Sequence, residues 1–353
     1  MKRRSGSLLA LMGYLIVGAL AGVGDAQANH VVMHDGPFGG MILSIVTDPR
    51  RPSTLYAASF GAGLFKSEDG GMVWVAMNEG LSEPRVLSLA IDPTAPATVY
   101  AGTDRGVYRS ADGGGHWGVA SAGLGRRNVR AIAMDPTAPA TVYAATDAGV
   151  YKSTDQGRHW RAINDGLVDL DVRCLVVSAE APKVLYAGTW GGIYKTTDAG
   201  GHWNVASAGL RRLNVRALAM TPNGQELVYA GTTDGVYRSV DGGAHWEEAN
   251  EGLGRIPILS LVAVPSSFAT LYAGTVAGLA KSLDGGRHWS FIDYEPINLT
   301  ISALSLGPGS SETLYVATGA VAFKSLDGGS SWTELAQKAL RPGFRGSGKN
   351  RGG

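Results

Sequence analysis

Three arginines and one tryptophan are the residues whose types and spacing suggest chemistry. Arg130, Arg173 and Arg216 follow one another at intervals of 43 residues, each as the second residue of an apolar segment. Trp190 is the one tryptophan that falls outside a 43-residue spacing. Clustered guanidinium groups bind carboxylates and phosphates, and an exposed aromatic ring can anchor a partner or stack on a sugar. Together they predict recognition of an acidic ligand, provided that the fold brings them together.

Each of these candidates also has a structural interpretation. Arg127 and Arg212 lie in the preceding turns and are predicted to belong to the same site. Ion pairing with nearby carboxylates would instead give the arginines a local role, and the nearby aspartates are Asp165, Asp169 and Asp171. Trp190 could equally pack on a neighbouring residue at the rim. Both interpretations stay open from the sequence.

Five histidines repeat at the same interval and suggest a metal site. They are His116, His159, His202, His245 and His288. All ligands of a zinc ion must approach it to within about 2.1 Å. Equivalent outer positions of neighbouring sheets lie much further apart, because sheets pack about 10 Å from one another and splay outward. We therefore predict structural histidines, no metal and no cofactor.

An eight-residue motif sets the interval that these residues share. Its pattern is Ser/Thr-x-Asp-x-Gly-x-x-Trp, as in Ser110 to Trp117, and it occurs seven times. Aspartate and serine hydrogen-bond backbone donors in tight turns, and glycine supplies the positive φ that such turns need. A fixed period of this length is typical of repeat architectures. The motif aspartates are Asp69, Asp112, Asp155, Asp198, Asp241, Asp284 and Asp327, and the motif tryptophans are Trp74, Trp117, Trp160, Trp203, Trp246, Trp289 and Trp332.

Each repeat contains four short candidate strands. In the second copy they begin near Val86, Thr98, Gly106 and Trp117. Four short strands per repeat are typical of one β-propeller blade. The sequence therefore predicts an all-β fold, a seven-bladed β-propeller of four-stranded antiparallel blades.

Two further positions keep one residue type in all copies. A tyrosine opens each second strand, as Tyr186 does, and is expected to be buried between blades. A lysine or arginine precedes each motif, as Lys195 does, and is expected to be solvated or ion-paired.

The motif resembles the Asp-box, or BNR repeat, of sialidases, xyloglucanases, sortilin-type receptors and photosystem II assembly factors. The match spans residues 41–337. The chain looks most like the photosystem II assembly and stability factors, a resemblance that implies a non-catalytic protein holding a membrane-protein precursor. In that family an arginine patch on one face is implicated in binding, and the matching residues here are Arg130, Arg173 and Arg216. The resemblance also implies that the boxes are structural turns remote from the active face.

Three function classes fit these features. The favoured one is an exported, non-catalytic binding or assembly module that recognises a protein or acidic ligand through its arginine-rich central face. A secreted peptide receptor, as in the sortilin-type proteins, differs mainly in its ligand. The alternative is a glycoside hydrolase similar to sialidases or xyloglucanases, with carbohydrate as the partner.

The hydrolase alternative depends on a few residues. Arg255-Ile256-Pro257 resembles the Arg-Ile-Pro motif of sialidases, and Asp104 and Asp147 could supply two carboxylates. Glycoside hydrolysis needs such carboxyl groups about 5 to 9.5 Å apart. Every turn between the repeats is short, which leaves little chain for a substrate cleft. We therefore expect binding rather than catalysis, with no catalytic residues assigned.

The two ends differ from the repeats. Residues 1–28 combine a basic start, an apolar run and a small-residue cleavage pattern, which predicts a signal peptide, or a membrane anchor if it is not cleaved. Residues 29–337 are predicted to form the propeller, and the basic, glycine-rich residues 338–353 to be disordered. Residues 30–37 resemble a fourth strand and are expected to add outside the seventh blade.

Charge and cysteine content narrow the partner classes. The net charge is +1 over 353 residues, and both ends are basic, so the propeller itself is acidic and nucleic-acid binding is not expected. Cys174, the one cysteine, occupies a small-residue packing position. We expect a monomer in the periplasm or outside the cell, whose partner is a protein or peptide, including a membrane-protein precursor.

Overall fold

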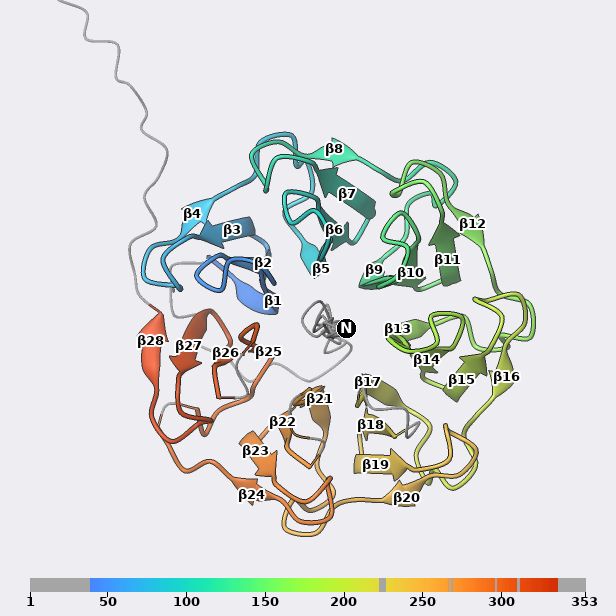
Figure 1. Ribbon diagram of the computed structural model, residues 1–353, viewed down its shortest axis with the longest axis vertical. Coiled ribbons are helices and arrows are strands. Elements are labelled where there is room, and N and C mark those ends of the chain that lie inside the picture. The colour runs from blue at the N-terminus through green and yellow to red at the C-terminus, as the bar shows by residue number, and fades with distance from the viewer. Residues whose placement is uncertain are drawn as a thin grey trace, which may run out of the picture.

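Seven sheets surround a central axis in the computed structural model, which describes residues 39–221, 227–265, 267, 269–295, 297–309 and 312–335. Each sheet consists of four consecutive antiparallel strands, so the predicted seven-bladed β-propeller is confirmed (Figure 1). Among the described residues there is no helix, and so none long and apolar enough to cross a membrane.

The strands of each blade are given from the innermost to the outermost. Blade 1 contains β1 (Met41–Thr47), β2 (Leu55–Phe60), β3 (Gly63–Ser67) and β4 (Val75–Ala76). Blade 2 contains β5 (Val86–Ile91), β6 (Val99–Thr103), β7 (Gly106–Ser110) and β8 (Gly118–Val119). Blade 3 contains β9 (Val129–Met134), β10 (Val142–Thr146), β11 (Gly149–Ser153) and β12 (Arg161–Ala162). Blade 4 contains β13 (Val172–Val177), β14 (Leu185–Thr189), β15 (Gly192–Thr196) and β16 (Asn204–Val205). Blade 5 contains β17 (Val215–Met220), β18 (Val228–Thr232), β19 (Gly235–Ser239) and β20 (Glu247–Glu248). Blade 6 contains β21 (Ile258–Ala263), β22 (Leu271–Thr275), β23 (Gly278–Ser282) and β24 (Ser290–Phe291). Blade 7 contains β25 (Ala303–Leu306), β26 (Leu314–Thr318), β27 (Val321–Ser325) and β28 (Thr333–Leu335).

Three sequence predictions concern residues outside the described ranges. They are the signal segment at 1–28, the additional strand at 30–37 and the basic tail at 338–353. All three stay predictions.

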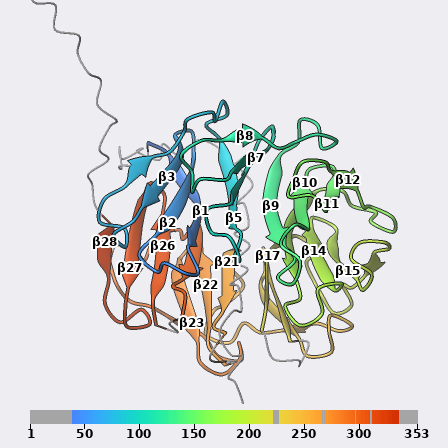
Figure 2. The ribbon, with the colours of Figure 1, turned by 45° about the horizontal axis from the view of Figure 1, so that its top comes forward.

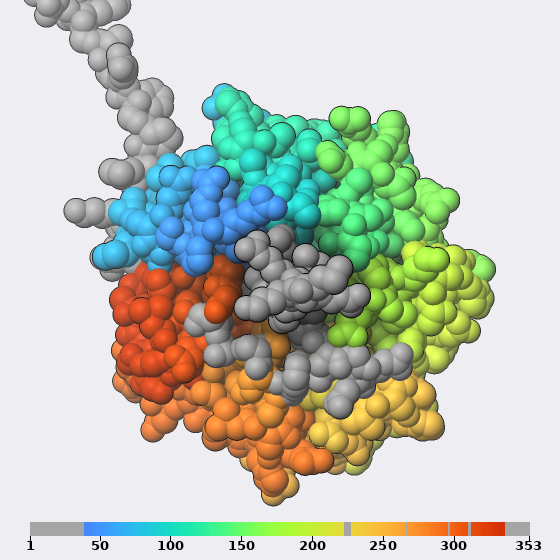
Figure 3. All heavy atoms as spheres, in the orientation of Figure 1, coloured from blue at the N-terminus to red at the C-terminus, as the bar shows by residue number. Residues whose placement is uncertain are grey.

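The order of strands defines two faces of the disc. Because consecutive strands are antiparallel, the turns that enter each first strand lie on the same face as the turns between second and third strands. We call this the entry face. The eight-residue motifs join third to fourth strands and therefore lie on the opposite face. Figure 2 shows the first strands side by side around the axis, and Figure 3 shows neighbouring blades in contact around the disc.

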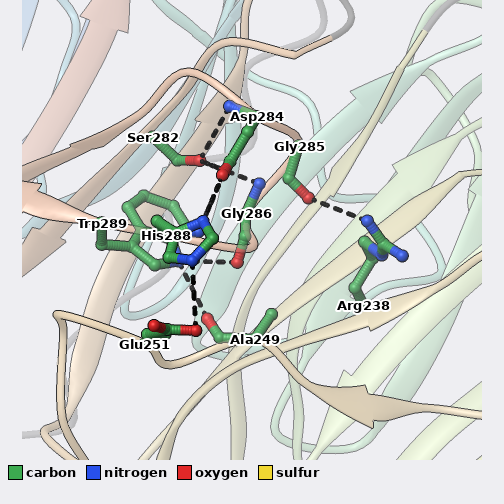
Figure 4. A network of polar contacts seen from close by, with 9 residues as sticks. All are labelled: Arg238, Ala249, Glu251, Ser282, Asp284, Gly285, Gly286, His288 and Trp289. Atoms are coloured by element: carbon green, nitrogen blue, oxygen red, sulfur yellow. Dashed lines mark hydrogen bonds and ion pairs between the residues drawn. The ribbon is translucent and has the colours of Figure 1, made fainter.

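Hydrogen bonds inside each motif hold its turn closed. In blade 6, Ser282 Oγ donates to Asp284 Oδ1 at 2.9 Å and accepts from the backbone N–H of Gly286 at 2.9 Å. The backbone N–H of His288 donates to Asp284 Oδ1 at 2.9 Å (Figure 4). The predicted structural role of the aspartate and serine is therefore observed directly.

The motif also joins blades 2 to 6 to their predecessors. In blade 6, the backbone N–H of Trp289 donates to the carbonyl of Glu251 in blade 5, and its Nε1 donates to the carbonyl of Ala249, both at 2.8 Å. In the reverse direction, Tyr229 Oη and Arg238 Nη1 of blade 5 donate to the carbonyl of Gly285, at 3.1 and 3.3 Å. We call this arrangement the seam.

The seam explains both positions that keep one residue type. The tyrosines are buried, as predicted, and the hydroxyls of Tyr56, Tyr186 and Tyr272 also reach the next motif, at Gly113, Gly242 and Gly328. The lysines are not simply solvated or ion-paired, because Lys195 and Lys281 donate to the same carbonyls as the tyrosines, at 2.8 and 2.9 Å. A long cationic side chain buries its stem against the tyrosine and completes a bond between blades.

The ring closes between blades 7 and 1 by side-by-side packing. The backbone N–H of Ile42 donates to the carbonyl of Gly319, and Ser302 Oγ donates to the carbonyl of Ile42, both at 2.8 Å. Leu335 in β28 belongs to the same apolar cluster as Trp74 of blade 1. Blade 7 therefore takes its fourth strand from its own repeat.

We predict that Tyr229→Phe lowers the free energy of unfolding by about 1 kcal/mol, because it removes a buried hydrogen bond across a seam. Tyr143→Phe is the matched control, since the Tyr143 hydroxyl is buried without a hydrogen-bond partner and its removal should be neutral or stabilising. Denaturant titration followed by tryptophan fluorescence measures both. Equal losses in the two variants would contradict the seam described here.

We predict that Ala199→Gly stabilises the protein by about 0.5–1 kcal/mol, because Ala199 has a φ of 61° at a motif position where five other copies have glycine. The reciprocal change, Gly113→Ala at a φ of 72°, should destabilise by a similar amount. Both effects are measurable as opposite shifts of the denaturation midpoint. Shifts of the same sign would argue against backbone strain at this position.

Candidate functional site

The three arginines occupy β-bulges in the first strands of blades 3 to 5. In blade 4 the pairing register shifts between Val172 and Cys174, which leaves Arg173 as the extra residue. The same shift occurs at Arg130 and Arg216. A bulge bends its strand and re-aims the side chain of the extra residue. The local backbone therefore distinguishes these positions from the regular strand around them.

Equivalent bulges in blades 1, 2 and 6 carry leucine instead. The six bulge residues, which we call the bulge belt, are Leu43, Leu87, Arg130, Arg173, Arg216 and Leu259. All six lie near the start of innermost strands, and these strands surround the central axis in Figure 1. Leu43 and Leu87 pack against each other. The belt is thus cationic in the consecutive blades 3 to 5 and apolar in blades 6, 1 and 2, and blade 7 contributes no member.

Asp171 joins two of the arginines. It precedes β13 and forms ion pairs with Arg130 of the preceding blade and with Arg173, the latter at 2.9 Å. The expected local pairing therefore occurs, but only through this aspartate. Asp165 instead pairs with His202, and Asp169 accepts the backbone N–H of Gly191. Asp171 pairs with two of the three guanidinium groups, and Arg216 has no ion-pair partner among the described residues.

Several polar atoms of the site are buried without a hydrogen-bond partner. They are Nε and Nη1 of Arg173, Nε of Arg216 and Oδ1 of Asn214. Arg173 is only 5% exposed. Burial lowers the pKa of all three arginines, and the charge of Arg173 further lowers the pKa of Arg130 and Arg216. Leaving buried donors unpaired costs free energy that an anionic ligand could recover.

Trp190 combines the two roles considered from the sequence. The Arg173 guanidinium carbon lies 4.1 Å from the centre of its ring, so the tryptophan packs on a neighbour. At the same time the side chain is 46% exposed in the turn between β14 and β15, on the entry face. It therefore fixes Arg173 and still offers surface to a partner.

Arg127 and Arg212 are less closely connected to this site. Both are exposed in turns that precede first strands. Arg127 Nη1 donates to the carbonyl of Arg126 at 3.5 Å, and within the described ranges neither residue forms a hydrogen bond or ion pair with the bulge arginines. Their participation in binding stays a prediction.

Sequence reasoning missed Asn214, although a signal for it exists. Asn128, Asp171 and Asn214 each stand two residues before a bulge arginine, at the same 43-residue interval. Asn128 Nδ2 donates to Asp147 Oδ2 at 2.6 Å, whereas the Asn214 oxygen is unpaired. The repeated pattern of a polar residue, valine and arginine would have identified this second polar row.

The residues proposed for hydrolysis already have local partners. Asp104 lies 3.4 Å from Arg85 Nη1, and Asp147 accepts from Asn128. Arg255 Nη2 contacts both carboxylate oxygens of Glu248, at 3.1 and 3.0 Å. Arg255 therefore belongs to a surface ion pair near blade 5 and not to the bulge belt.

The repeated histidines lie on the motif face and do not gather. His288 Nδ1 lies 2.5 Å from Asp284 of its own motif, and Nε2 lies 3.2 Å from Glu251 of blade 5 (Figure 4). These carboxylates raise the pKa of His288, and the histidine lowers the pKa of Asp284. Among the described residues, no three His, Cys, Asp or Glu side chains are grouped so that they could hold a metal ion.

Comparisons with known proteins identify the fold of this chain, but the similar proteins do not share a single function. No protein-family model and no curated protein matches the chain. A GH74 xyloglucanase from Xanthomonas campestris is similar with a TM-score of 0.70 and 17% identity, over 87% of this chain and 55% of the enzyme. YCF48 bound to D1 peptide is similar with a TM-score of 0.66 and 16% identity, over 83% of this chain and 95% of YCF48. The extracellular domain of a protein described as a one-component system, from B. thetaiotaomicron, has a TM-score of 0.63 and 16% identity, over 86% of this chain and 39% of that domain.

The chain spans about half the length of the xyloglucanase it resembles. Identities this low show a shared propeller and nothing finer. A xyloglucanase, YCF48 with a bound peptide and the extracellular domain of a one-component system all use it, so function must be argued from the site.

Proposed function

We propose that this protein is a non-catalytic binding module that acts outside the cytoplasm and recognises carboxylate groups of a protein or peptide. The recognition site is formed by Arg130, Arg173 and Arg216 of the bulge belt. The observation that carries the proposal is the set of buried guanidinium N–H groups without partners on Arg173 and Arg216.

The charges of the site favour an anionic ligand. Asp171 compensates part of the charge of Arg130 and Arg173, whereas Arg216 has no ion-pair partner among the described residues. Hydrogen bonds from a charged donor to a charged acceptor are about twice as strong as neutral ones, and they strengthen where water is excluded. A ligand carboxylate would therefore find donors that the protein leaves unused.

Two similar structures are compatible with this mode of action. One was determined with a bound peptide, and another is an extracellular domain. The basic and apolar pattern of residues 1–28 supports export. A peptide partner is therefore proposed ahead of a carbohydrate.

Glycoside hydrolysis has less support. Asp104 and Asp147 are each held by a neighbour on the entry face, and Arg255 is held by Glu248. We expect no turnover of xyloglucan or sialosides. Turnover that disappears in Asp104→Asn or Asp147→Asn would replace binding by catalysis as the function.

We predict that wild-type protein enriches Asp- and Glu-containing sequences from a random peptide library. The double variant Arg173→Gln/Arg216→Gln should lose this enrichment, because it removes the charge and the unpaired donors together. For a selected peptide, each single change should weaken binding about tenfold or more, as expected for a charged hydrogen bond. Raising the salt concentration should weaken wild-type binding as well.

Arg255→Gln is the control, because it removes an arginine that lies outside the bulge belt. It should retain wild-type enrichment. Absence of acidic enrichment in the wild type, or equal enrichment in the double variant, would overturn the proposed function.

A further inference from the structure

Four exposed apolar side chains lie in the entry-face segments next to β13, β14 and β17, of which β13 and β17 are the first strands that carry Arg173 and Arg216. Val168 is 83% exposed, Leu170 40%, Trp190 46% and Leu213 43%. Val168 and Leu170 precede β13, Trp190 follows β14 and Leu213 precedes β17. We call these four residues the blade-4 patch. Clusters of exposed apolar residues rimmed by polar groups mark interaction sites on soluble proteins.

Backbone contacts hold the patch in place. The carbonyl of Leu170 accepts the N–H of Gly149 at 2.7 Å. Asp169 accepts the N–H of Gly191, next to Trp190, at 2.5 Å. A Cβ at Gly192 would lie 3.6 Å from Leu213 Cδ2, which places Leu213 against the same turn. A patch that is ordered before binding loses little conformational entropy when a ligand arrives.

The patch and the unpaired donors are adjacent. Trp190 stacks on Arg173 at 4.1 Å, and Arg173 supplies two of the unpaired N–H groups. Leu213 directly precedes Asn214, whose Oδ1 is also unpaired, and Arg216 follows two residues later. One short ligand segment can therefore contact both the cationic and the apolar groups.

We propose that the blade-4 patch makes recognition selective for peptide segments in which a carboxylate lies beside a large apolar side chain. This inference rests on the proposed function, since Arg173 and Arg216 bind the carboxylate. The patch adds the requirement for a large apolar side chain beside that carboxylate. A sugar fits less well, because the guanidinium covers one face of Trp190 and the other members of the patch are aliphatic.

The experiment compares two peptides of equal length and charge. One carries glutamate beside leucine and phenylalanine, and the other carries glutamate beside two serines. Fluorescence anisotropy measures the dissociation constant of each. Wild-type protein should bind the apolar peptide about tenfold more tightly, as expected for partial burial of a large apolar side chain.

Three groups of variants separate the two requirements. Leu213→Ser and Val168→Ser should bring the affinity ratio close to one while the serine peptide binds as before. The test uses these two changes and not Trp190→Ala, because loss of the Trp190 ring would also remove the group that positions Arg173. Arg173→Gln should weaken binding of both peptides. Leu299→Ser is the control, since Leu299 is 58% exposed in the turn before blade 7, where the belt has no arginine.

The outcomes distinguish this inference from the proposed function. Equal wild-type affinity for the two peptides would overturn the selectivity and leave carboxylate binding intact. The inference would also be overturned if the affinity ratio of the two peptides stayed at the wild-type value in both Leu213→Ser and Val168→Ser. A fall of the ratio in Leu299→Ser as large as in these two variants would overturn it as well. Failure of the wild type to bind either peptide would overturn both proposals.

Discussion

A backbone carbonyl in the motif connects neighbouring blades at the motifs of blades 2, 4, 5, 6 and 7. At Gly242 it accepts the Tyr186 hydroxyl and the Lys195 ammonium, both from the preceding blade. The carbonyl is available because the backbone of the motif is turned into a conformation with positive φ. The motif aspartate and serine hold that turn, and the motif tryptophan anchors it to the preceding blade. Each blade thus adds contacts with its two neighbours to its own strand pairing, as in other repeat proteins.

This constraint determines where the chain can vary. The seam uses the flanks of each blade and the motif face, so those positions keep their residue types in every repeat. The bulge residues take no part in the seam bonds described above. Leucine, arginine and serine therefore alternate at equivalent places of the first strands without disturbing the ring. Binding residues can change from blade to blade on a framework that does not change.

The repeat period was sufficient to predict the blades, their number and the burial of residues such as Tyr229. It also placed Arg173 on an innermost strand, because the first strand of each blade is recognisable as an apolar run. The period could not show that Arg173 is a bulge residue, since a bulge arises from strand pairing and leaves no mark in the apolar pattern. It could not show that Asp171 lies between two blades, because that contact depends on how the blades are rotated against each other. The role of Lys195 was misjudged for a related reason: its acceptor lies 47 residues further along the chain.

Each blade is made from four consecutive strands. Among the described residues, no strand of blade 1 joins the sheet of blade 7, and no strand of blade 7 joins the sheet of blade 1. All junctions between blades therefore have the same strand topology. New chain ends could be opened between any two blades, and a circularly permuted protein would rebuild the same contacts. Because each repeat encodes one whole blade, tandem duplication of a repeat would add a complete sheet. The added sheet would carry the residues that contact the blades on both of its sides.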